Sequence, residues 1–222
     1  PVVCMRADKA DGVTHYASSS TSSPWVDLVS PQSNAGLVNF DGTTASGWVG
    51  NGTSGSPYRL EFDGDNDVVT IPAASVSDLM SAPAHSAELW VKTGDVNSSR
   101  LQEMVEWLSG MNSSAGMSIA AQSGKLMLYL GGDLQWLPVA DVSPSTWYHV
   151  AVVKLPGEVR VYLNGLRVYT GGTPDFGIPA TEIVLGGSTW RGAGLYGEYW
   201  KGSIAQFCAW KGAMTDAQVG AD

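Results

Sequence analysis

Three aspartates at alternate positions, Asp63, Asp65 and Asp67, stand in the stretch YRLEFDGDNDVVTIP. Carboxylates at alternate positions of an extended strand share one face, where they could hold a structural Ca²⁺ together with backbone carbonyls. An EF-hand loop would need glycine at its sixth position and an acid at its twelfth, but these positions hold Val68 and Ala74. Aspartate and glycine are also ordinary turn residues. The three aspartates are therefore either Ca²⁺ ligands or the polar tip of a β-hairpin, and the pattern favours the hairpin.

The carboxylate pair that comes nearest to a catalytic arrangement is Glu103 and Glu106 in LQEMVEW. Glycosidases place two carboxyl groups on either side of the scissile bond. A spacing of three puts these two glutamates on opposite faces of a strand. The three histidines are scattered and none lies in a nucleophile motif. We therefore predict no catalytic residues and a protein that is not an enzyme.

Aromatic residues in glycine-rich loops suggest carbohydrate binding. Aromatic faces stack on the C–H surfaces of sugars, and planar polar side chains hydrogen-bond the hydroxyl groups. The stretches GGSTWRGAGLYGEYW, GGDLQWLP and SGMNSSAG supply both kinds of group. The predicted ligand-binding residues are Trp190, Arg191, Tyr196, Glu198, Trp136, Gln135 and Asn112. Trp136 and Trp200 could instead fold back over the edge of the sheet, whereas Trp90, Trp147 and Trp210 stand in strand patterns and are expected in the core.

Segments with period-two alternation recur along the chain and predict strands. In KLMLYLG, Leu126, Leu128 and Leu130 share one face. In EVRVYLNGLRVYT, Asn164 and Gly165 are the preferred pair for a type I′ hairpin turn. The expected strands span residues 2–7, 58–62, 67–71, 87–92, 101–108, 116–122, 125–131, 147–154, 158–170 as a hairpin, 182–187 and 202–210.

Helix signals are sparse, and only 75–82 and 214–221 are expected to form a turn or two, the second capped by Thr215 or Asp216. Residues 8–57 are rich in Ser, Thr, Gly and Asn, with apolar anchors that indicate one or two short strands. With 27 glycines, 11 prolines and 15% charged residues, the composition favours an all-β sandwich or barrel.

The two cysteines, Cys4 and Cys208, lie near opposite ends of the sequence. Their spacing excludes a CxxC zinc or redox motif. They form one bridge if the first and last strands are neighbours, or else they are two buried free thiols. The sequence leaves both alternatives open.

The net charge of −9 argues against nucleic acid and anionic lipid surfaces as partners, since both require clustered Lys and Arg. No apolar run approaches the roughly 20 residues that span a bilayer. The sequence begins at Pro1 without a signal-like segment, so we expect a processed protein or a module of a longer one.

The order of motifs resembles the laminin G-like, concanavalin A-like jelly rolls, a superfamily that includes pentraxins. The residues that carry this resemblance are YRLEFDGDNDVVTIP, AELWVK, STWYHVAVVK, EVRVYLNGLRV, IVLGG and KGSIAQFCAWKGAMTDAQV, over about 58–222. The resemblance implies a single jelly-roll domain of two antiparallel sheets over 1–222, in which 1–57 supply an N-terminal strand and pinned loops. The stretches corresponding to the pentraxin calcium loops contain only one acid, Glu198, which argues against a calcium site of that kind.

Members of this family are usually non-catalytic modules of secreted bacterial enzymes, adhesins or phage structural proteins. We therefore predict a recognition module on an extracellular or virion surface that binds carbohydrate. The alternative is a decoration or assembly domain of a phage head or tail, held by contacts with a neighbouring structural protein. Oligomerisation and a structural Ca²⁺ both remain open at this point.

Overall fold

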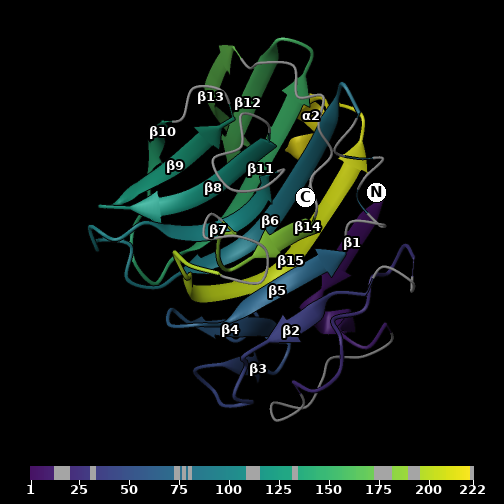
Figure 1. Cartoon of the computed structure of the whole chain (residues 1–222), viewed down its shortest axis with the longest axis vertical. Coiled ribbons are helices and arrows are strands. Elements are labelled where there is room, and N and C mark those ends of the chain that lie inside the picture. Colours follow the sequence, from purple (N-terminus) through teal and green to yellow (C-terminus); the bar gives the residue numbers. More distant parts are fainter. Residues whose placement is uncertain are drawn as a thin grey trace.

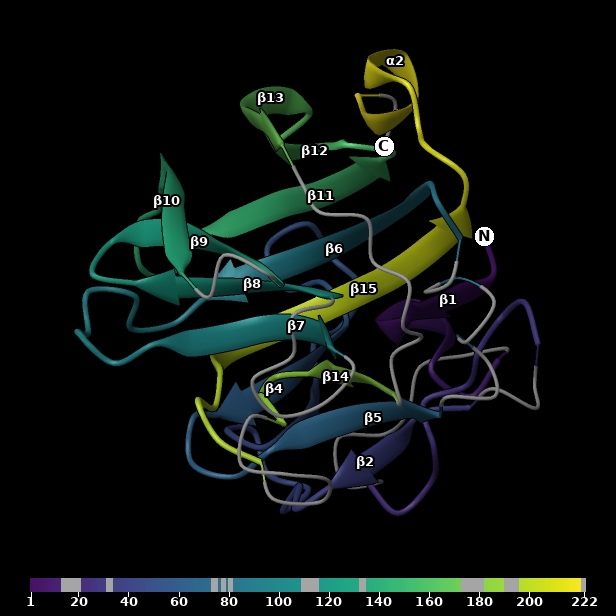
Figure 2. The same ribbon diagram turned by 45° about the horizontal axis from the view of Figure 1, so that its top comes forward.

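The computed structural model describes residues 1–12, 21–30, 34–72, 76, 79, 82–108, 116–131, 135–172, 182–189 and 196–220. Two antiparallel sheets pack face to face in these residues (Figures 1 and 2). This is the predicted all-β jelly-roll sandwich. None of the described helices is long and apolar enough to cross a membrane.

The eight-stranded sheet contains the first and the last strands of the chain. Its order is β13 (Leu166–Gly172), β12 (Glu158–Leu163), β11 (Trp147–Leu155), β6 (His85–Thr93), β15 (Lys201–Lys211), β4 (Arg59–Asp63) and β3 (Gly47–Val49), with β1 (Val3–Arg6) also paired to β15. The consecutive strands β11, β12 and β13 form the predicted meander. At its hairpin turn Asn164 and Gly165 have φ values of 52° and 75°, as a type I′ turn requires.

The seven-stranded sheet forms the second layer. Its order is β10 (Trp136–Asp141), β9 (Lys125–Leu130), β8 (Gly116–Gln122), β7 (Gln102–Leu108), β14 (Glu182–Leu185), β5 (Val68–Pro72) and β2 (Gly36–Val38). The short strands β2 and β3 join the described part of the Ser/Gly-rich segment to the two sheets. Strand β10 was not expected, because its sequence was interpreted as part of a loop.

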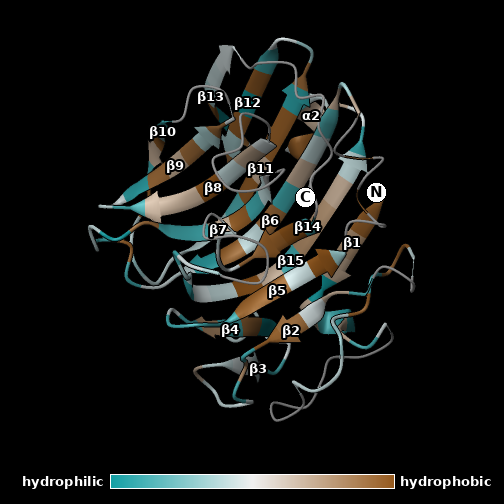
Figure 3. Cartoon of the chain, in the orientation of Figure 1, coloured by the Kyte–Doolittle hydropathy of each residue, from teal (hydrophilic) through white to brown (hydrophobic). Residues whose placement is uncertain are grey.

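The core lies between the two sheets and follows the alternation of each strand. Leu126, Leu128 and Leu130 of β9 point into it and are buried, as predicted, whereas Tyr129 points outward and is half-buried. The hydropathy colouring shows apolar residues along β5, β9 and β14 (Figure 3). Burial of this apolar surface is the main stabilising term of the fold.

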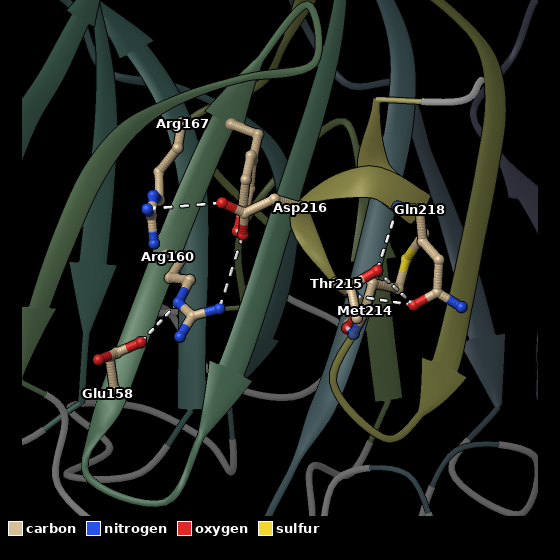
Figure 4. Close-up of polar contacts among 9 residues, drawn as sticks. Glu158, Arg160, Arg167, Met214, Thr215, Asp216 and Gln218 are labelled. Carbon is tan, nitrogen blue, oxygen red and sulfur yellow. Dashed lines mark hydrogen bonds and ion pairs between the residues drawn. The ribbon is translucent and has the colours of Figure 1, made fainter.

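The C-terminal helix α2 (Asp216–Val219) begins at Thr215, which forms a capping box with Gln218 (Figure 4). Val219 is fully buried and packs on Ala151, Val153 and Tyr162, on the outer face of the eight-stranded sheet. A short 3-10 helix, η1 (Ala7–Lys9), follows β1. Most of the other predicted helical segment, 75–82, lies outside the described residues.

Cys4 and Cys208 form a disulfide across the antiparallel pair β1–β15, where they are direct cross-strand partners. Of the two alternatives left open by the sequence, the structure shows the bridge. It joins residues 204 positions apart. The first and last strands are thus connected both by backbone hydrogen bonds and by a covalent bond.

The acidic stretch from Asp63 to Asp67 is not a hairpin tip, contrary to the sequence interpretation. It joins β4, which pairs with β3 and β15, to β5, which pairs with β2 and β14 in the opposite sheet. The segment therefore crosses from one layer of the sandwich to the other. Alternation divides the side chains of a strand between two faces but does not identify the neighbouring strand, so both arrangements agreed with the sequence.

Trp90, Trp147 and Trp210 are also placed differently from the expectation of a core position. Each is only half-buried. Trp90 pairs in register with Gln206 and His149, and the buried core positions of its strand are the alternate residues Leu89 and Val91. The three tryptophans therefore lie on the outer face of the eight-stranded sheet.

Candidate functional site

A single row of side chains crosses the outer face of the seven-stranded sheet. Cross-strand partners share one face of a sheet, so successive register pairs define this row. From β10 to β2 it consists of Trp136, Tyr129, Ser118, Glu106, Val184, Thr70 and Gly36. The row places aromatic groups at one edge of the sheet and polar groups near its centre.

A β-bulge in β7 adds a second carboxylate to this face. The register between β7 and β8 shifts between Glu103 and Val105, so Met104 is the extra residue. Ser118, the cross-strand partner of Glu106, donates a hydrogen bond to the Glu103 carboxylate. Both glutamates therefore lie on the outer face, and the expectation that a spacing of three separates them is wrong. A bulge reverses the alternation for all residues that follow it.

Both carboxyl groups are buried, since Glu103 and Glu106 are each only 2% exposed. Burial raises the pKa of Glu103 well above its usual range, and the nearby Glu106 charge raises it further. Burial also raises the pKa of Glu106, although hydrogen bonds from Thr189 oppose that shift. The Thr189 backbone N–H donates to Glu106 Oε1 at 2.9 Å, and its hydroxyl donates to the same oxygen. Burial next to a second carboxylate therefore favours the protonated form of Glu103.

Glu198 lies beside this pair. Its backbone carbonyl accepts a hydrogen bond of 2.8 Å from the Glu103 N–H, and its φ of 51° is in the left-handed region. The Lys201 N–H donates to Gln102 Oε1 at 3.1 Å, and Gly197 forms an isolated bridge with Ser188. The segment before β15 is therefore fixed along β7 and β14, next to the two glutamates.

Tyr129 and Trp136 form an aromatic pair at the β9–β10 edge of the same face. Their ring centroids are 5.4 Å apart and the ring planes are inclined by 47°. Both rings are half-buried, and the preceding Gln135 is exposed. Burial raises the pKa of the Tyr129 hydroxyl, with added contributions from the charges of Glu103 and Glu106. The pair thus offers an accessible aromatic surface beside polar groups.

The predicted ligand-binding residues are only partly brought together. Trp136 and Gln135 lie at the aromatic edge, and Glu198 lies near the carboxyl pair. Tyr196 is half-buried, and its carbonyl accepts a hydrogen bond from the Tyr199 hydroxyl at 2.8 Å. Trp200 is fully buried, so it does fold back onto the sandwich. Three of the predicted residues, Trp190, Arg191 and Asn112, lie outside the described residues.

The sequence interpretation did not include Tyr129, Ser118 or Thr189 in the site. Tyr129 was detectable, because it alternates with the core leucines of KLMLYLG and must point outward. Ser118 and Thr189 gave no signal of this kind, since their roles depend on the bulge and on the pairing of β7 with β8 and β14.

The three aspartates of the crossing segment do not converge on a common point. Asp67 is fully buried and accepts hydrogen bonds from the Ser46 hydroxyl at 2.9 Å and from the Asp63 N–H at 3.0 Å. Asp63 accepts from the Asp65 N–H at 2.7 Å. In the part of the chain that the structure describes, no three His, Cys, Asp or Glu side chains group together as metal ligands would. Both carboxylate oxygens of Asp67 and Oδ1 of Asp63 thus accept local hydrogen bonds within this turn.

Comparison with known proteins supports this architecture. Residues 62–220 match the family model described as the concanavalin A-like lectin/glucanases superfamily. No curated protein sequence matches the chain. Domain 4 of an extracellular arabinanase from Geobacillus stearothermophilus, in complex with arabinotriose, is similar with a TM-score of 0.65 at 19% identity. That similarity covers 90% of this chain and 93% of the arabinanase domain.

Two other solved structures are similar at low identity. The carbohydrate-binding module CBM40 of the Ruminococcus gnavus IT-sialidase, bound to sialyllactose, has a TM-score of 0.55 at 16% identity, covering 66% of this chain and 86% of the module. The receptor-binding domain of botulinum neurotoxin mosaic serotype C/D has a TM-score of 0.64 at 14% identity, covering 99% of this chain and 49% of that domain. Such identities show a shared fold. Together with the family match over most of its length, they show that the chain belongs to the concanavalin A-like lectin/glucanase superfamily.

Proposed function

We propose that the chain is a non-catalytic, extracellular binding module whose ligand is carbohydrate. The observation that carries this proposal is the half-exposed aromatic pair Tyr129–Trp136, which stands next to Gln135 and the polar centre of the outer sheet face. Sugar rings present C–H faces that pack on aromatic rings and hydroxyl groups that bond to carboxamide and hydroxyl side chains. Both kinds of partner occur here within one row of a rigid sheet.

The state of the two glutamates supports a binding function over a hydrolytic one. A glycosidase requires one carboxyl group to reach the leaving-group oxygen and the other to reach the anomeric centre or a water. Glu103 and Glu106 are each 2% exposed and accept hydrogen bonds from Ser118 and Thr189. Buried in this way, the two carboxyl groups would stabilise the sheet face beneath a ligand and would not reach the ligand themselves.

Two of the similar structures carry a bound sugar, arabinotriose in one and sialyllactose in the other. At 19% and 16% identity the likeness extends to the fold, and the ligand of this chain is a separate question. These structures support the proposal because they show that sandwiches of this shape serve as carbohydrate-binding domains.

An extracellular location is supported by the Cys4–Cys208 bridge. Disulfides form and persist in secreted and surface proteins, whereas reducing compartments keep thiols free. The module would then meet glycans of cell surfaces or of the surrounding medium.

The test is a glycan array with native protein and with Trp136→Ala, run in Ca²⁺ and again in chelator. We expect binding by the native protein and a loss of about fivefold or more in the variant, since a lost aromatic stack is worth about 1 kcal/mol or more. Val29→Ser is the matched control, because this exposed residue follows Leu28, whose N–H bonds to the Cys4 carbonyl of β1 in the other sheet. An array without any bound glycan in either condition would refute the proposal.

Protein contact is the second candidate, with a structural or assembly role such as that of a phage decoration domain. The observation in its favour is β13, an edge strand of the eight-stranded sheet on which Leu166 is 72% exposed and Val168 is 36% exposed. Exposed apolar edges offer unpaired backbone groups to another chain. Light scattering over a concentration series tests this role, and we expect association that Leu166→Ser weakens if it holds.

A further inference from the structure

The outer face of the eight-stranded sheet carries a second aromatic surface, on the side of the sandwich opposite Trp136. Trp90 of β6 pairs in register with His149 of β11, and Trp147 stands two residues before His149. The two tryptophans are therefore diagonal neighbours on one sheet face. Both are half-buried, so both indole rings remain partly accessible to solvent.

These rings border a groove made of two adjoining hollows. The larger, of about 310 Å³, is lined by Trp90, Trp147, Pro57, Ala205 and Ser54. The smaller, of about 210 Å³, shares Pro57, Trp90 and Ala205 and continues toward η1. Its further lining residues are Arg6, Asp8, Gly52, Tyr58 and Gln206. The hollows thus form one continuous groove over β6, β11 and β15, which lie side by side in Figures 1 and 2.

A second β-bulge creates the floor of this groove. The register between β15 and β6 shifts between Ile204 and Gln206, so Ala205 is the extra residue. Its side chain is a single methyl group, and it lines both hollows beside Trp90. Bulges re-aim side chains and are frequent beside binding sites.

The wall of the groove is fixed by its own hydrogen bonds. The Asn51 and Gly52 N–H groups both donate to the Ser56 carbonyl, at 2.9 and 3.1 Å. The Ser56 N–H donates back to the Thr53 carbonyl at 3.0 Å. Arg59 donates to the Pro57 carbonyl at 3.2 Å and holds the end of this turn against β4. A wall ordered in this way loses little entropy when a ligand binds.

Trp90 also rests on a fixed base. Its ring packs on the His149 ring with a centroid distance of 5.3 Å, and His149 Nε2 lies 3.4 Å from the Glu88 carboxylate. Both His149 and Glu88 are almost fully buried. The indole is therefore held in place in the absence of a ligand.

The rim of the groove is polar but carries no net charge of its own. Arg6 donates to both carboxylate oxygens of Asp8, at 3.0 and 2.8 Å, and Gln206 is the cross-strand partner of Arg6. A planar guanidinium, carboxylate and carboxamide next to indole rings match the hydroxyl groups and C–H faces of a sugar. A charged ligand would have to compete with the Arg6–Asp8 pair, whereas an uncharged one can bond to both partners while the pair stays intact.

We propose that this groove, defined by Trp90, Trp147, Pro57, Ala205, Arg6 and Gln206, is a second carbohydrate site that takes an uncharged oligosaccharide. It lies on the opposite sheet from the aromatic pair Tyr129–Trp136 and shares no residue with that pair. A chain with both sites would hold two glycan segments on its two faces. Such bivalent contact raises the overall strength of binding to a polymer that reaches both sites.

The experiment follows the indole N–H signals of the intact protein by NMR, assigned by single Trp→Phe variants, during titration with cellotriose, xylotriose, maltotriose, mannotriose and arabinotriose. We expect at least one trisaccharide to shift the signals of Trp90 and Trp147. The shift should persist in Trp136→Ala, which separates this site from the one on the other sheet. Trp90→Ala and Trp147→Ala should each weaken the affinity about tenfold or more.

Trp210→Ala is the matched control, because Trp210 is a half-buried tryptophan on the same sheet face outside the groove. It should leave the titration unchanged, and the melting temperature of each variant verifies that it is folded. The absence of any shift at Trp90 and Trp147 with all five sugars would overturn the proposal. So would shifts that vanish in Trp136→Ala, or an affinity that Trp90→Ala leaves at the native value.

Discussion

Ser118 donates a hydrogen bond to Glu103 although its cross-strand partner is Glu106. This is possible because the bulge at Met104 turns both carboxylates to one face of β7. Two acids then share a buried position next to one hydroxyl group. The arrangement has a measurable consequence for stability.

Glu103→Gln should stabilise the protein at pH 7.5 and change it little at pH 4.5. The folded-state pKa of Glu103 is raised by burial and by Glu106, so folding favours the protonated form. The contribution of Glu103 to the free energy of unfolding is full below the pKa that it has in the unfolded chain. It is lost as the pH rises through the pKa that it has in the folded protein. Glutamine is a neutral isostere that can still accept the Ser118 hydrogen bond. Urea unfolding at the two pH values measures the effect, and the exposed Asp141→Asn is the control.

Asp67 should impose a similar pH dependence within a defined window. Burial raises its pKa from 3.8 to about 6, so its contribution to the unfolding free energy falls as the pH rises from about 4 to about 6. His85 acts in the opposite sense, because burial lowers its pKa from 6.5 to about 4 and stability is lost as the pH falls through that range. Because Asp67 is buried and ionised at pH 7.5, Asp67→Asn should increase the free energy of unfolding at that pH by on the order of 2 kcal/mol. At pH 4 the substitution should have little effect. An equal change at both pH values would contradict this account.

Ca²⁺ should leave the melting temperature of the protein unchanged. The oxygens of Asp67 in the crossing segment already accept hydrogen bonds from the Ser46 hydroxyl and the Asp63 N–H. A cation that binds only the folded state must raise the melting temperature. Calorimetry in Ca²⁺ and in chelator compares the native protein with Asp65→Asn. A Ca²⁺-dependent increase that Asp65→Asn removes would establish the metal site expected as an alternative from the sequence.

Loss of the Cys4–Cys208 bridge should destabilise the sandwich by about 3 to 5 kcal/mol, because it closes a loop of about 200 residues in the unfolded chain. A reductant should lower the melting temperature of the native protein. The double variant Cys4→Ser/Cys208→Ser should melt at the lower temperature with or without reductant. The prediction would be contradicted if the native protein melted at the same temperature with and without reductant, although unfolding exposes the disulfide to the reductant.

Helix α2 allows the stability contributed by a buried apolar side chain to be compared with that contributed by an exposed ion pair. Asp216 accepts a 2.7 Å hydrogen bond from Tyr162 and lies 3.7 and 3.4 Å from Arg160 and Arg167, but its side chain is 54% exposed (Figure 4). Exposed ion pairs contribute about 1 kcal/mol or less. Val219→Ala removes fully buried methyl groups and should cost about 1 to 3 kcal/mol. Urea unfolding should therefore show a larger loss for Val219→Ala than for Asp216→Asn.

Features determined by neighbouring residues along the chain were predictable from the sequence. The alternation of Leu126, Leu128 and Leu130, the turn at Asn164–Gly165 and the cap at Thr215 depend on local geometry, and the structure confirms each. Features that depend on pairing between distant strands were not predictable. The bulges at Met104 and Ala205 are of this kind, because an extra residue in a ladder is defined only relative to the partner strand.

The candidate sites show the same division. The aromatic edge at Trp136 was expected from its glycine-rich surroundings, whereas Tyr129 joins it through the register of β9 with β10. Trp90 and Trp147 were expected in the core because their strands alternate regularly. Alternation does not tell which of two apolar faces is covered, since both Trp90 and its neighbours Leu89 and Val91 are apolar.

The bridge between β1 and β15 also determines how the molecule responds to tension. Force applied upstream of Cys4 and downstream of Cys208 passes through the sulfur–sulfur bond and bypasses the 203 residues between them. The strands between the two cysteines, and the two proposed binding faces that they carry, are bypassed by the load. Tethered to a surface under flow, the protein could be pulled at both ends without losing the geometry of either face.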